Sequence, residues 1–392
     1  MELTLKTLTP IWTGGIDGTC DRIHETGIIG SLRWWYEALV RIDPELLREC
    51  GMCEVCQNYG TTGWRQRFKL EMIGGSPVFR QKTITIPSGR IHQNRRGKDY
   101  VGGWRLGSGI MGEIACRIIP LNDGMNDVSF LLPIVLAEKW GGLGAKTQQG
   151  YGIFCLVDKK GHSVKLNAHI EPLLSESSPK RILSGSSPKR NLPNLQDMFF
   201  AKLQFEAGQE DWWKKVSLID IALERTVKDG QKTIPLNDIS GELRALAELR
   251  TVPVAPAFKN WLRFGGKYER KEGSVLRTIG NKPWLSKELF GFVGRNDEKQ
   301  GSLIHISSAY LNGNTWEIRV WGWIPETKKY NREEVLRELY DVLCTPSQWR
   351  HLLGSQTSNA RLAVWREFNS VRDTVRQIRH PAEYLTSLLF EE

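Results

Sequence analysis

The sequence lacks any long uninterrupted stretch of apolar residues. No run of 18 apolar residues occurs among its 392 residues, so no membrane-spanning helix is predicted. Residues 1–6 alternate apolar and polar side chains, which is typical of a strand rather than of a secretory signal. Seven cysteines, an odd number, and no export signal make a disulfide framework unexpected. The predicted compartment is therefore a reducing cytoplasm.

Acidic residues are scarce in one part of the chain. The whole sequence has a net charge of +10, but residues 64–105 contain ten basic and two acidic residues and so carry +8 of it. A concentrated basic field favours a polyanionic partner, and salt should weaken that binding. The alternative is a solvated basic face. RNA contacts are predicted in this window for Trp64, Arg65, Arg67, His92, Arg95, Arg96 and Lys98, the last four in a hydrophilic stretch that predicts a protruding loop.

The hydrophobic pattern of the first 158 residues predicts an α+β fold. Gly30-Ser31 is interpreted as the start of a helix with Ser31 as its cap, and Leu32, Trp35, Leu39 and Ile42 as its inner face. Strand, helix, strands, helix, strand is the order of a ferredoxin-like or RRM-like module. The predicted strands are residues 2–9, 68–73, 83–87, 112–119 and 151–157, and the second helix is 128–140.

The second half predicts another module after a linker. Residues 171–197 are rich in Ser, Pro and Lys, which is typical of a flexible connector between modules at 1–170 and 198–392. The predicted strands are 199–205, 302–307 and 316–323, and the predicted helices are 212–225, capped by Asp211, 332–343 and one near the C-terminus. An aromatic-Gly-x-x-Gly turn at 59–63 recurs at 290–294, which hints at a duplication.

A glycine-rich loop at residues 141–152 lies between a predicted helix and a predicted strand. Its pattern is Gly-apolar-Gly, five residues, Gly-aromatic-Gly. Glycines let a backbone approach closely, and exposed N–H groups can then hold an anion. Lys146 adds charge, and Tyr151 offers a ring on which an unstacked base could lie. The predicted RNA contacts of this loop are Gly142, Gly144, Lys146, Gln148, Gln149, Gly150 and Tyr151.

Two nucleotide-binding interpretations of the same loop fail. Ala145 stands where a P-loop requires glycine, and a helix rather than a strand precedes the loop. A dinucleotide fingerprint needs a strand first and a helix second, which is the reverse order. The plain alternative to RNA binding is a turn that needs glycine for its own geometry.

With this loop, the sequence resembles the RAMP superfamily, the repeat-associated RNA-binding proteins of CRISPR systems. Residues 8–15 (LTPIWTGG), 30–35 (GSLRWW) and 56–64 (CQNYGTTGW) are similar to the first RAMP subunit of the type III-B effector, the Cmr complex. The resemblance is specific over residues 1–157 and weaker beyond. It implies two RRM-like modules and a place in a crRNA-guided complex, where the chain would contact the 3′ part of the crRNA, target RNA and other RAMP subunits, with no membrane and no small-molecule substrate.

Three cysteines at two-residue gaps predict a metal site. Cys50, Cys53 and Cys56 have the spacing of thiolate ligands to one tetrahedral ion, and an iron–sulfur run would want a further cysteine where Gly60 stands. Structural zinc is therefore predicted, as a knuckle inserted in the first module, with Cys20 or His24 as the fourth ligand. The alternative is three thiols in a buried turn.

The first helix and the loop before it hold the remaining candidates. Arg33 and Arg41 are predicted RNA contacts and Trp34 a stacking side chain, whereas Trp35 is expected in the core. The main hypothesis is a non-catalytic RNA-binding and assembly subunit. The alternative is a metal-independent endoribonuclease using Asp17, Asp21 and His24. A zinc-ribbon DNA-binding regulator is disfavoured because no second CxxC pair is present.

Overall fold

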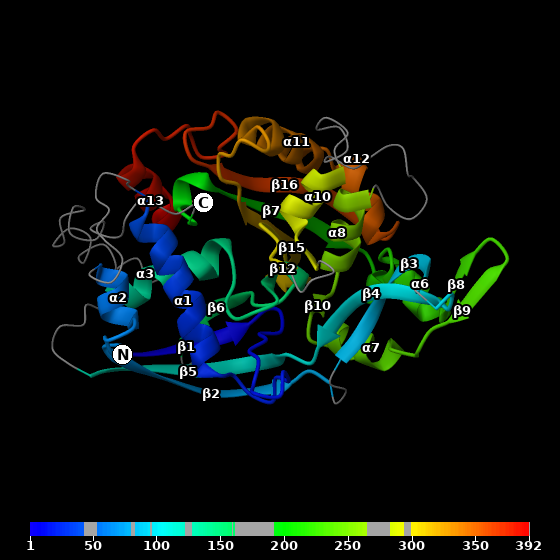
Figure 1. The fold of residues 1–392 in the computed structure, drawn as a ribbon, viewed down its shortest axis with the longest axis horizontal. Coiled ribbons are helices and arrows are strands. Elements are labelled where there is room, and N and C mark those ends of the chain that lie inside the picture. Colours follow the sequence, from blue (N-terminus) through cyan, green and yellow to red (C-terminus); the bar gives the residue numbers. More distant parts are fainter. Residues whose placement is uncertain are drawn as a thin grey trace.

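The computed structural model combines helices with antiparallel sheets, so the predicted α+β class is confirmed (Figure 1). It describes residues 1–42, 53–79, 83–94, 96–121, 128–158, 160, 192–264, 283–293 and 299–391. Among these residues, none of the helices is both long enough and apolar enough to cross a membrane.

The first half is built on a four-stranded antiparallel sheet with the order β2-β5-β1-β6. Along the chain, a helix α1 (Glu25–Val40) follows the first strand and a helix α3 (Val128–Trp140) precedes the last, and the two helices pack against each other. The four strands are β1 (Glu2–Thr7), β2 (Phe68–Pro77), β5 (Ile110–Pro120) and β6 (Phe154–Val157).

The second half is built on another antiparallel sheet, whose strands follow the order β10-β14-β15-β7-β16, with β13 also paired to β15. A helix α11 (Arg332–Cys344) connects the last two strands in chain order. The strands are β7 (Met198–Ala207), β10 (Thr251–Val252), β13 (Ile304–Ile306), β14 (Ala309–Asn312), β15 (Thr315–Trp323) and β16 (Thr357–Glu367).

Four strands of each sheet follow a matching order. The order β2-β5-β1-β6 of the first half corresponds to β14-β15-β7-β16 of the second, and β10 extends the second sheet beyond β14. The two glycine turns noted in the sequence also correspond, because Gly60 and Gly291 each follow a short helix with positive φ, 82° and 73°. Those helices are α2 (Glu54–Tyr59) and α10 (Pro283–Phe290).

Each half contributes an element to the core of the other. The hairpin of β3 (Thr83–Gln93) and β4 (Asp99–Gly107) is inserted between β2 and β5, yet its apolar side chains pack in the core of the second half. The C-terminal helix α13 (Pro381–Phe390) packs against α3, where Trp140 Nε1 donates a hydrogen bond to Leu388 O at 2.7 Å. The two cores therefore depend on each other.

A buried arginine also joins the halves. Arg319 on β15 donates from Nη1 to Glu138 O and, at 3.4 Å, to Gly141 O, at the C-terminal end of α3. Its Nε donates to the Tyr310 hydroxyl at 2.6 Å. The positive charge thus lies where the helix dipole favours a cation.

The remaining elements cover the sheets or connect them. They are η2 (Thr147–Gln149), η3 (Leu195–Asp197), η4 (Trp212–Lys215), α6 (Ile219–Glu224), β8 (Thr226–Asp229), β9 (Lys232–Pro235), α7 (Ser240–Glu248), α8 (Ala255–Phe264), β11 (Phe292–Val293), β12 (Lys299–Gln300), α12 (Pro346–Trp349) and η5 (Arg350–Leu353).

The start of the first helix differs from the prediction. α1 begins at Glu25 with His24 as its N-cap, so Ser31 lies inside the helix and does not cap it. Gly27, also inside α1, serves close packing. A Cβ at Gly27 would lie 3.0 Å from Thr13 Cγ2, which means that this position must be small for α1 to approach the preceding segment. The predicted inner face is correct, because its members are all buried.

Two further elements differ from the prediction. The helix expected at 212–225 is split into η4 and α6 by Leu218, which has φ 71°, and Asp211 makes no capping hydrogen bond. Trp212 and Trp213 are both buried, and adjacent residues cannot share one face of a straight helix. The stretch predicted as a protruding loop is only partly a loop: His92 belongs to β3, which continues to Gln93, whereas Arg96 and Lys98 lie between β3 and β4.

The end of the predicted linker is ordered against the first half. Most of residues 171–197 lie outside the described residues. At 193, however, the main-chain oxygen of Pro193 accepts a hydrogen bond from Arg41 Nη1 at 3.3 Å, and Leu195 is buried.

Candidate functional site

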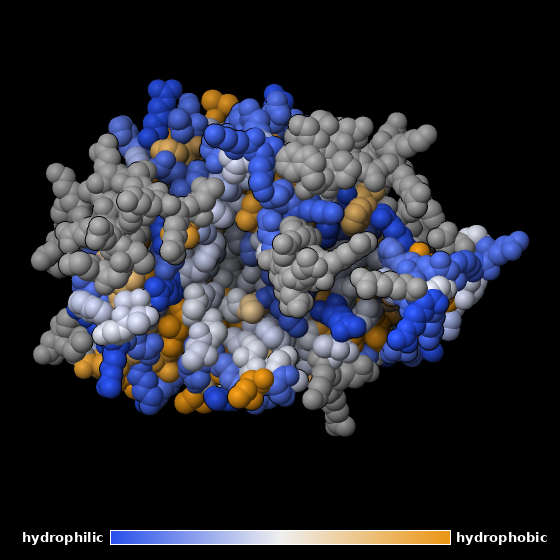
Figure 2. Space-filling view, in the orientation of Figure 1, coloured by the Kyte–Doolittle hydropathy of each residue, from blue (hydrophilic) through white to orange (hydrophobic). Residues whose placement is uncertain are grey.

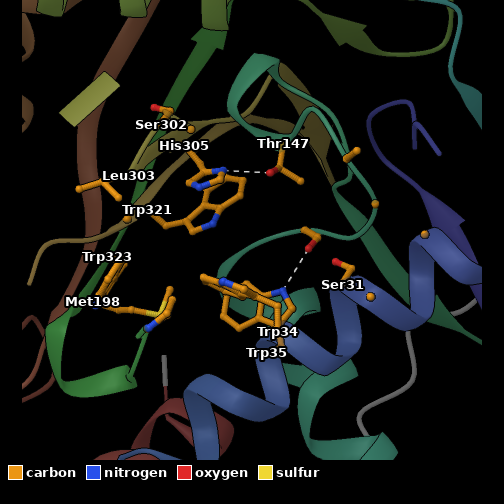
Figure 3. Close-up of a pocket in the computed structure, with 18 of the residues that line it drawn as sticks. Ser31, Trp34, Trp35, Thr147, Met198, Ser302, Leu303, His305, Trp321 and Trp323 are labelled. Carbon is orange, nitrogen blue, oxygen red and sulfur yellow. Dashed lines mark hydrogen bonds between the residues drawn. The ribbon is translucent and has the colours of Figure 1, made fainter. Parts of the chain in front are cut away.

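A cavity of about 580 Å³ lies between the two halves. Figure 3 shows Trp34 on α1 projecting toward Met198 and Trp323 of the second half, with His305 and Trp321 beside them. None of the described residues that line the cavity is Lys, Arg, Asp or Glu. A cavity with aromatic walls and uncharged polar groups suits a flat, uncharged group such as a nucleobase better than it suits a phosphate.

Most of the residues that α1 contributes to the cavity wall are small. Gly27, Gly30, Ser31 and Trp34 have the spacing i, i+3, i+4, i+7, so they lie on one face of the helix. A Cβ at Gly30 would meet no atom within 4 Å, so this position opens into the cavity. In Figure 2, pale residues of intermediate hydropathy run over α1 and border a hollow beside it.

The opposite part of the wall is the glycine-rich loop, and its glycines are required by close packing. A Cβ at Gly144 would lie 2.7 Å from Trp12 O, and one at Gly152 would lie 2.3 Å from Leu143 O. Ala145 N donates to Trp12 O, and Leu143 N donates to Gly152 O. Because these amides are used within the chain, packing explains much of the glycine pattern, and the exposed anion cradle expected from the sequence is not formed by them.

The side chains of the loop are less exposed than predicted. Lys146 Nζ lies 3.9 Å from the centroid of the Trp12 ring, and burial lowers the pKa of this amine. Tyr151 is only 5% exposed and its hydroxyl donates to Gly107 O at 2.6 Å, so its ring is not available for stacking in this structure. Gln149 Oε1 is buried and has no hydrogen-bond partner among the described residues.

His305 connects the loop to the second half. Its Nδ1 lies 2.9 Å from Thr147 Oγ1, and its ring stacks on Trp321 with centroids 5.2 Å apart. Burial lowers the pKa of His305 to about 3, and the nearby charge of Lys259 acts in the same direction. The imidazole is therefore neutral at pH 7 and can offer one donor and one acceptor.

The two arginines predicted on α1 have partners within the chain. Arg33 donates to Glu37 Oε1 at 2.9 Å and to Gly60 O at 2.7 Å, which ties α1 to the end of α2. Arg41 binds Glu37 and Pro193 O, and its side chain is only 10% exposed. Each arginine therefore has partners within the chain that account for its position without RNA. Trp34 lines the cavity and Trp35 is buried, with Nε1 donating to Gly142 O, as the core role predicted.

The other predicted RNA contacts lie away from the cavity lining. Arg65 is exposed, Trp64 is 48% exposed, and Arg67 Nη2 donates to Gln57 Oε1 at 3.4 Å. At the end of the β3–β4 hairpin, exposed side chains form a separate polar and aromatic surface, and Arg95 lies outside the described residues. This surface comprises His92, Arg96, Lys98 and Tyr100.

The residues of the nuclease alternative lie in the segment before α1, where Asp17 and Asp21 are exposed and His24 is partly buried. His24 Nε2 lies 2.9 Å from Asp21 Oδ1, and this contact lowers the pKa of the Asp21 carboxyl. Asp17 accepts hydrogen bonds from the backbone N and the hydroxyl of Thr19, which is the usual behaviour of an aspartate that forms a turn.

Two of the predicted zinc ligands lie in one helical turn. Cys53 is the N-cap of α2 and Cys56 follows on the same helix, and both are buried. Cys50 lies outside the described residues, within which there is no group of three or more metal-binding side chains. Cys20 Sγ accepts a hydrogen bond from Thr13 N at 3.3 Å in the loop before α1, whereas Cys56 Sγ lies 3.8 Å from Arg33 Nη2 on α1.

The second-half wall of the cavity was not predicted as a site. Met198, Leu303, Trp321 and Trp323 belong to strands or their ends, where the apolar pattern indicates only a core. The one signal was the density of tryptophans in β15, where Trp316, Trp321 and Trp323 occur in nine residues. Whether such residues face a core or a cavity depends on how the two halves meet.

Comparisons with known proteins confirm the resemblance stated from the sequence. Residues 4–155 match the family model of the RAMP superfamily. Two similar folds are chains of type III-B Cmr-beta complexes. One is bound to cognate target RNA and AMPPnP, in state 2 and in the presence of single-stranded DNA, with 12% identity, 87% of this chain and 99% of that chain covered, and a TM-score of 0.37. The other is bound to cognate target RNA, with 13% identity, 86% and 98% covered, and a TM-score of 0.37.

A third similar fold is Cmr1 from Pyrococcus furiosus in its apo form, with 14% identity, 85% of this chain and 92% of that chain covered, and a TM-score of 0.37. A comparison with curated protein sequences found no match.

Proposed function

We propose, from the premise that residues 4–155 are a RAMP superfamily module, that this chain is a non-catalytic RNA-binding subunit of a type III-B CRISPR ribonucleoprotein. Its partners would be crRNA, target RNA and other RAMP subunits. The repeated strand order of the two sheets supports a tandem of ferredoxin-like modules. The motifs at 8–15, 30–35 and 56–64 favour the first RAMP subunit of the Cmr complex.

The observation that carries this proposal is the uncharged aromatic cavity between the halves, bordered by the glycine-rich loop. Sequence-tolerant RNA binding combines rings on which bases stack with cations along the backbone path. Trp34 and Trp323 provide the rings, and the small α1 face lets a nucleotide approach. The net charge of +10 provides the attraction for the phosphates.

The cavity can be filled without disturbing the fold. Leucine is a good helix former, and position 30 has open space above it, so Gly30→Leu should fold normally and occupy the cavity. We expect the affinity for guide-like single-stranded RNA to fall at least about tenfold, the equivalent of losing one stacked base. Gly30→Ala is the matched control, because it leaves most of the cavity open. Equal affinity of both variants and wild type, measured by fluorescence anisotropy, would contradict the role of the cavity.

A nuclease role is the alternative to test. Asp21 is exposed and pairs with the partly buried His24, and Asp17 is engaged in a turn. In a reconstituted complex, Asp17→Ala, Asp21→Ala and His24→Ala should each leave target cleavage unchanged. Cleavage lowered a hundredfold or more by one of them would indicate acid–base catalysis instead.

We propose a structural zinc held by Cys50, Cys53 and Cys56 with a fourth ligand. The two buried thiols of Cys53 and Cys56, three residues apart at the start of α2, support it. Zinc would join α2 to the preceding segment and would have no open position for water. Metal analysis of protein purified without chelator should give about one zinc per chain, and Cys53→Ser should abolish it. A ratio near zero with all thiols titratable would refute the site.

A further inference from the structure

A pair of cationic residues lies on α8, next to the glycine-rich loop, and neither residue lines the cavity. Lys259 and Arg263 are four residues apart and therefore project from one side of the helix. Ala255, one turn before Lys259 on the same side, lies against the loop, because a Cβ at Gly150 would be 3.4 Å from its Cβ. This side of α8 thus follows the loop from Gly150 outward.

Lys259 is buried and Arg263 is partly buried, and no described carboxylate compensates either charge. Lys259 is only 6% exposed, and neither it nor Arg263 forms an ion pair among the described residues. Arg263 Nε is buried and has no hydrogen-bond partner there. Burial lowers the pKa of Lys259 to about 7, with Arg263 acting in the same direction, and burial lowers the pKa of Arg263 as well.

The surroundings add further positive charge. Arg90 on β3 lies over the ring of Phe264 at 4.6 Å, and Arg263 lies over the same ring at 5.1 Å. The neighbouring His305 is neutral, so it does not offset this charge. Like charges this close, one of them buried, are costly, and a bound anion would offset that cost.

We infer that Lys259 and Arg263 form a phosphate-binding site for the RNA backbone, next to the glycine-rich loop and outside the cavity lining. This inference rests on the proposed RNA-binding function for the source of the phosphate. A strand could then leave one base in the uncharged cavity and place a neighbouring phosphate at the cations of α8. The glycine-rich loop would contact both subsites and so position the RNA strand between them. Its own amides, which are bonded within the chain, would not bind the phosphate.

The test measures the salt dependence of RNA affinity in the full chain. Lys259→Met and Arg263→Met remove the charges while keeping comparable length, and Lys214→Met is the matched control, since Lys214 is exposed and paired with Asp211. We expect the slope of log affinity against log salt to fall by about one for each lost phosphate contact. Arg263→Lys keeps the charge and should retain most of the slope. An unchanged slope and affinity in the double variant would overturn the inference while leaving RNA binding by the chain intact.

Two further readouts separate this inference from the proposed function. Thermal unfolding with and without inorganic tripolyphosphate should show stabilisation of wild type that the double variant lacks. If wild type fails to bind RNA, the proposed function fails, and the tripolyphosphate shift alone decides the site: equal shifts in both proteins would overturn it. Without any anion, the double variant should be as stable as wild type or more so. A clear loss of stability would mean that the chain itself neutralises the cations, which would also overturn the inference.

Discussion

Single residues in the glycine-rich loop illustrate how one pattern can serve packing and function together. Gly150 has φ 106°, and its oxygen accepts a hydrogen bond from Ser308 N at 3.0 Å, so the loop is joined directly to the second half. Lys146 also has positive φ, 58°, which is uncommon for a residue with a Cβ. The loop is therefore held in one conformation by contacts with both halves, and this packing fixes the positions of its side chains.

Gly150→Ala should destabilise the protein by about 2–4 kcal/mol, because positive φ and a clash both oppose the new methyl group. Its Cβ would lie 2.5 Å from Ser308 Oγ and 2.8 Å from Ser308 N. Gly230→Ala is the control, since Gly230 also has positive φ, 59°, but nothing within 4 Å. Urea unfolding should show the larger loss at position 150. Equal losses would mean that the contact with Ser308 is not tight.

His305 should make the stability depend on pH. Its pKa is about 3 in the folded protein against 6.5 in the unfolded chain, so below 6.5 the unfolded state binds a proton that the folded state does not. Stability should therefore fall as the pH falls from about 6.5 toward 3, by at most about 1.4 kcal/mol per unit. His305→Gln should flatten this slope in urea titrations at several pH values, whereas exposed His92→Gln should not. The same slope in all three proteins would show that His305 is not the cause.

At the scale of elements, α1 shows why helix signals in the sequence were misleading. Gly30 and Ser31 suggested a boundary, but the helix continues through them because its other face, with Leu32, Trp35 and Leu39, is fully buried. Tertiary packing of an amphipathic face outweighs the weak propensity of two residues. Strand β4 was missed for a related reason: it is rich in glycine and lacks the alternation that marks a half-buried strand.

The two glycines of α1 should respond differently to alanine. Gly30→Ala should stabilise the protein by about 0.5–1 kcal/mol, because alanine is the better helix former and the new Cβ meets nothing. Gly27→Ala should gain less or lose stability, since its Cβ would lie 3.0 Å from Thr13 Cγ2. Thermal unfolding of the pair provides the comparison. A larger gain at position 27 would contradict the close approach of α1 to Thr13.

At the scale of the whole molecule, the halves exchange elements rather than meeting at a simple boundary. The β3–β4 hairpin of the first half completes the core of the second, and α13 of the second completes that of the first. The buried ion pair of Arg366 with Asp373 lies on this seam, with Arg366 also near the Trp140 ring at 5.5 Å. The cavity is a product of this arrangement, because its walls come from both halves.

Residues 1–158 expressed alone should therefore not form a stable fold. They would expose the apolar side of the hairpin and the surface of α3 that α13 covers. We expect aggregation or rapid proteolysis, and recovery of a compact form when residues 192–392 are co-expressed. A sharp thermal transition of the isolated fragment would show that the first core is self-sufficient.

The sequence by itself determined the α+β class, the order of elements in the first half, the 128–140 helix and the RAMP resemblance, because periodicity and local motifs are read within a few neighbouring residues. Only the tertiary structure decided which of those residues form a site. Tyr151 proved to be buried, and Trp34 and Trp323 to line one cavity. Residues as distant in the chain as Trp34 and Trp323 meet only when the two halves pack, and that packing sets their burial.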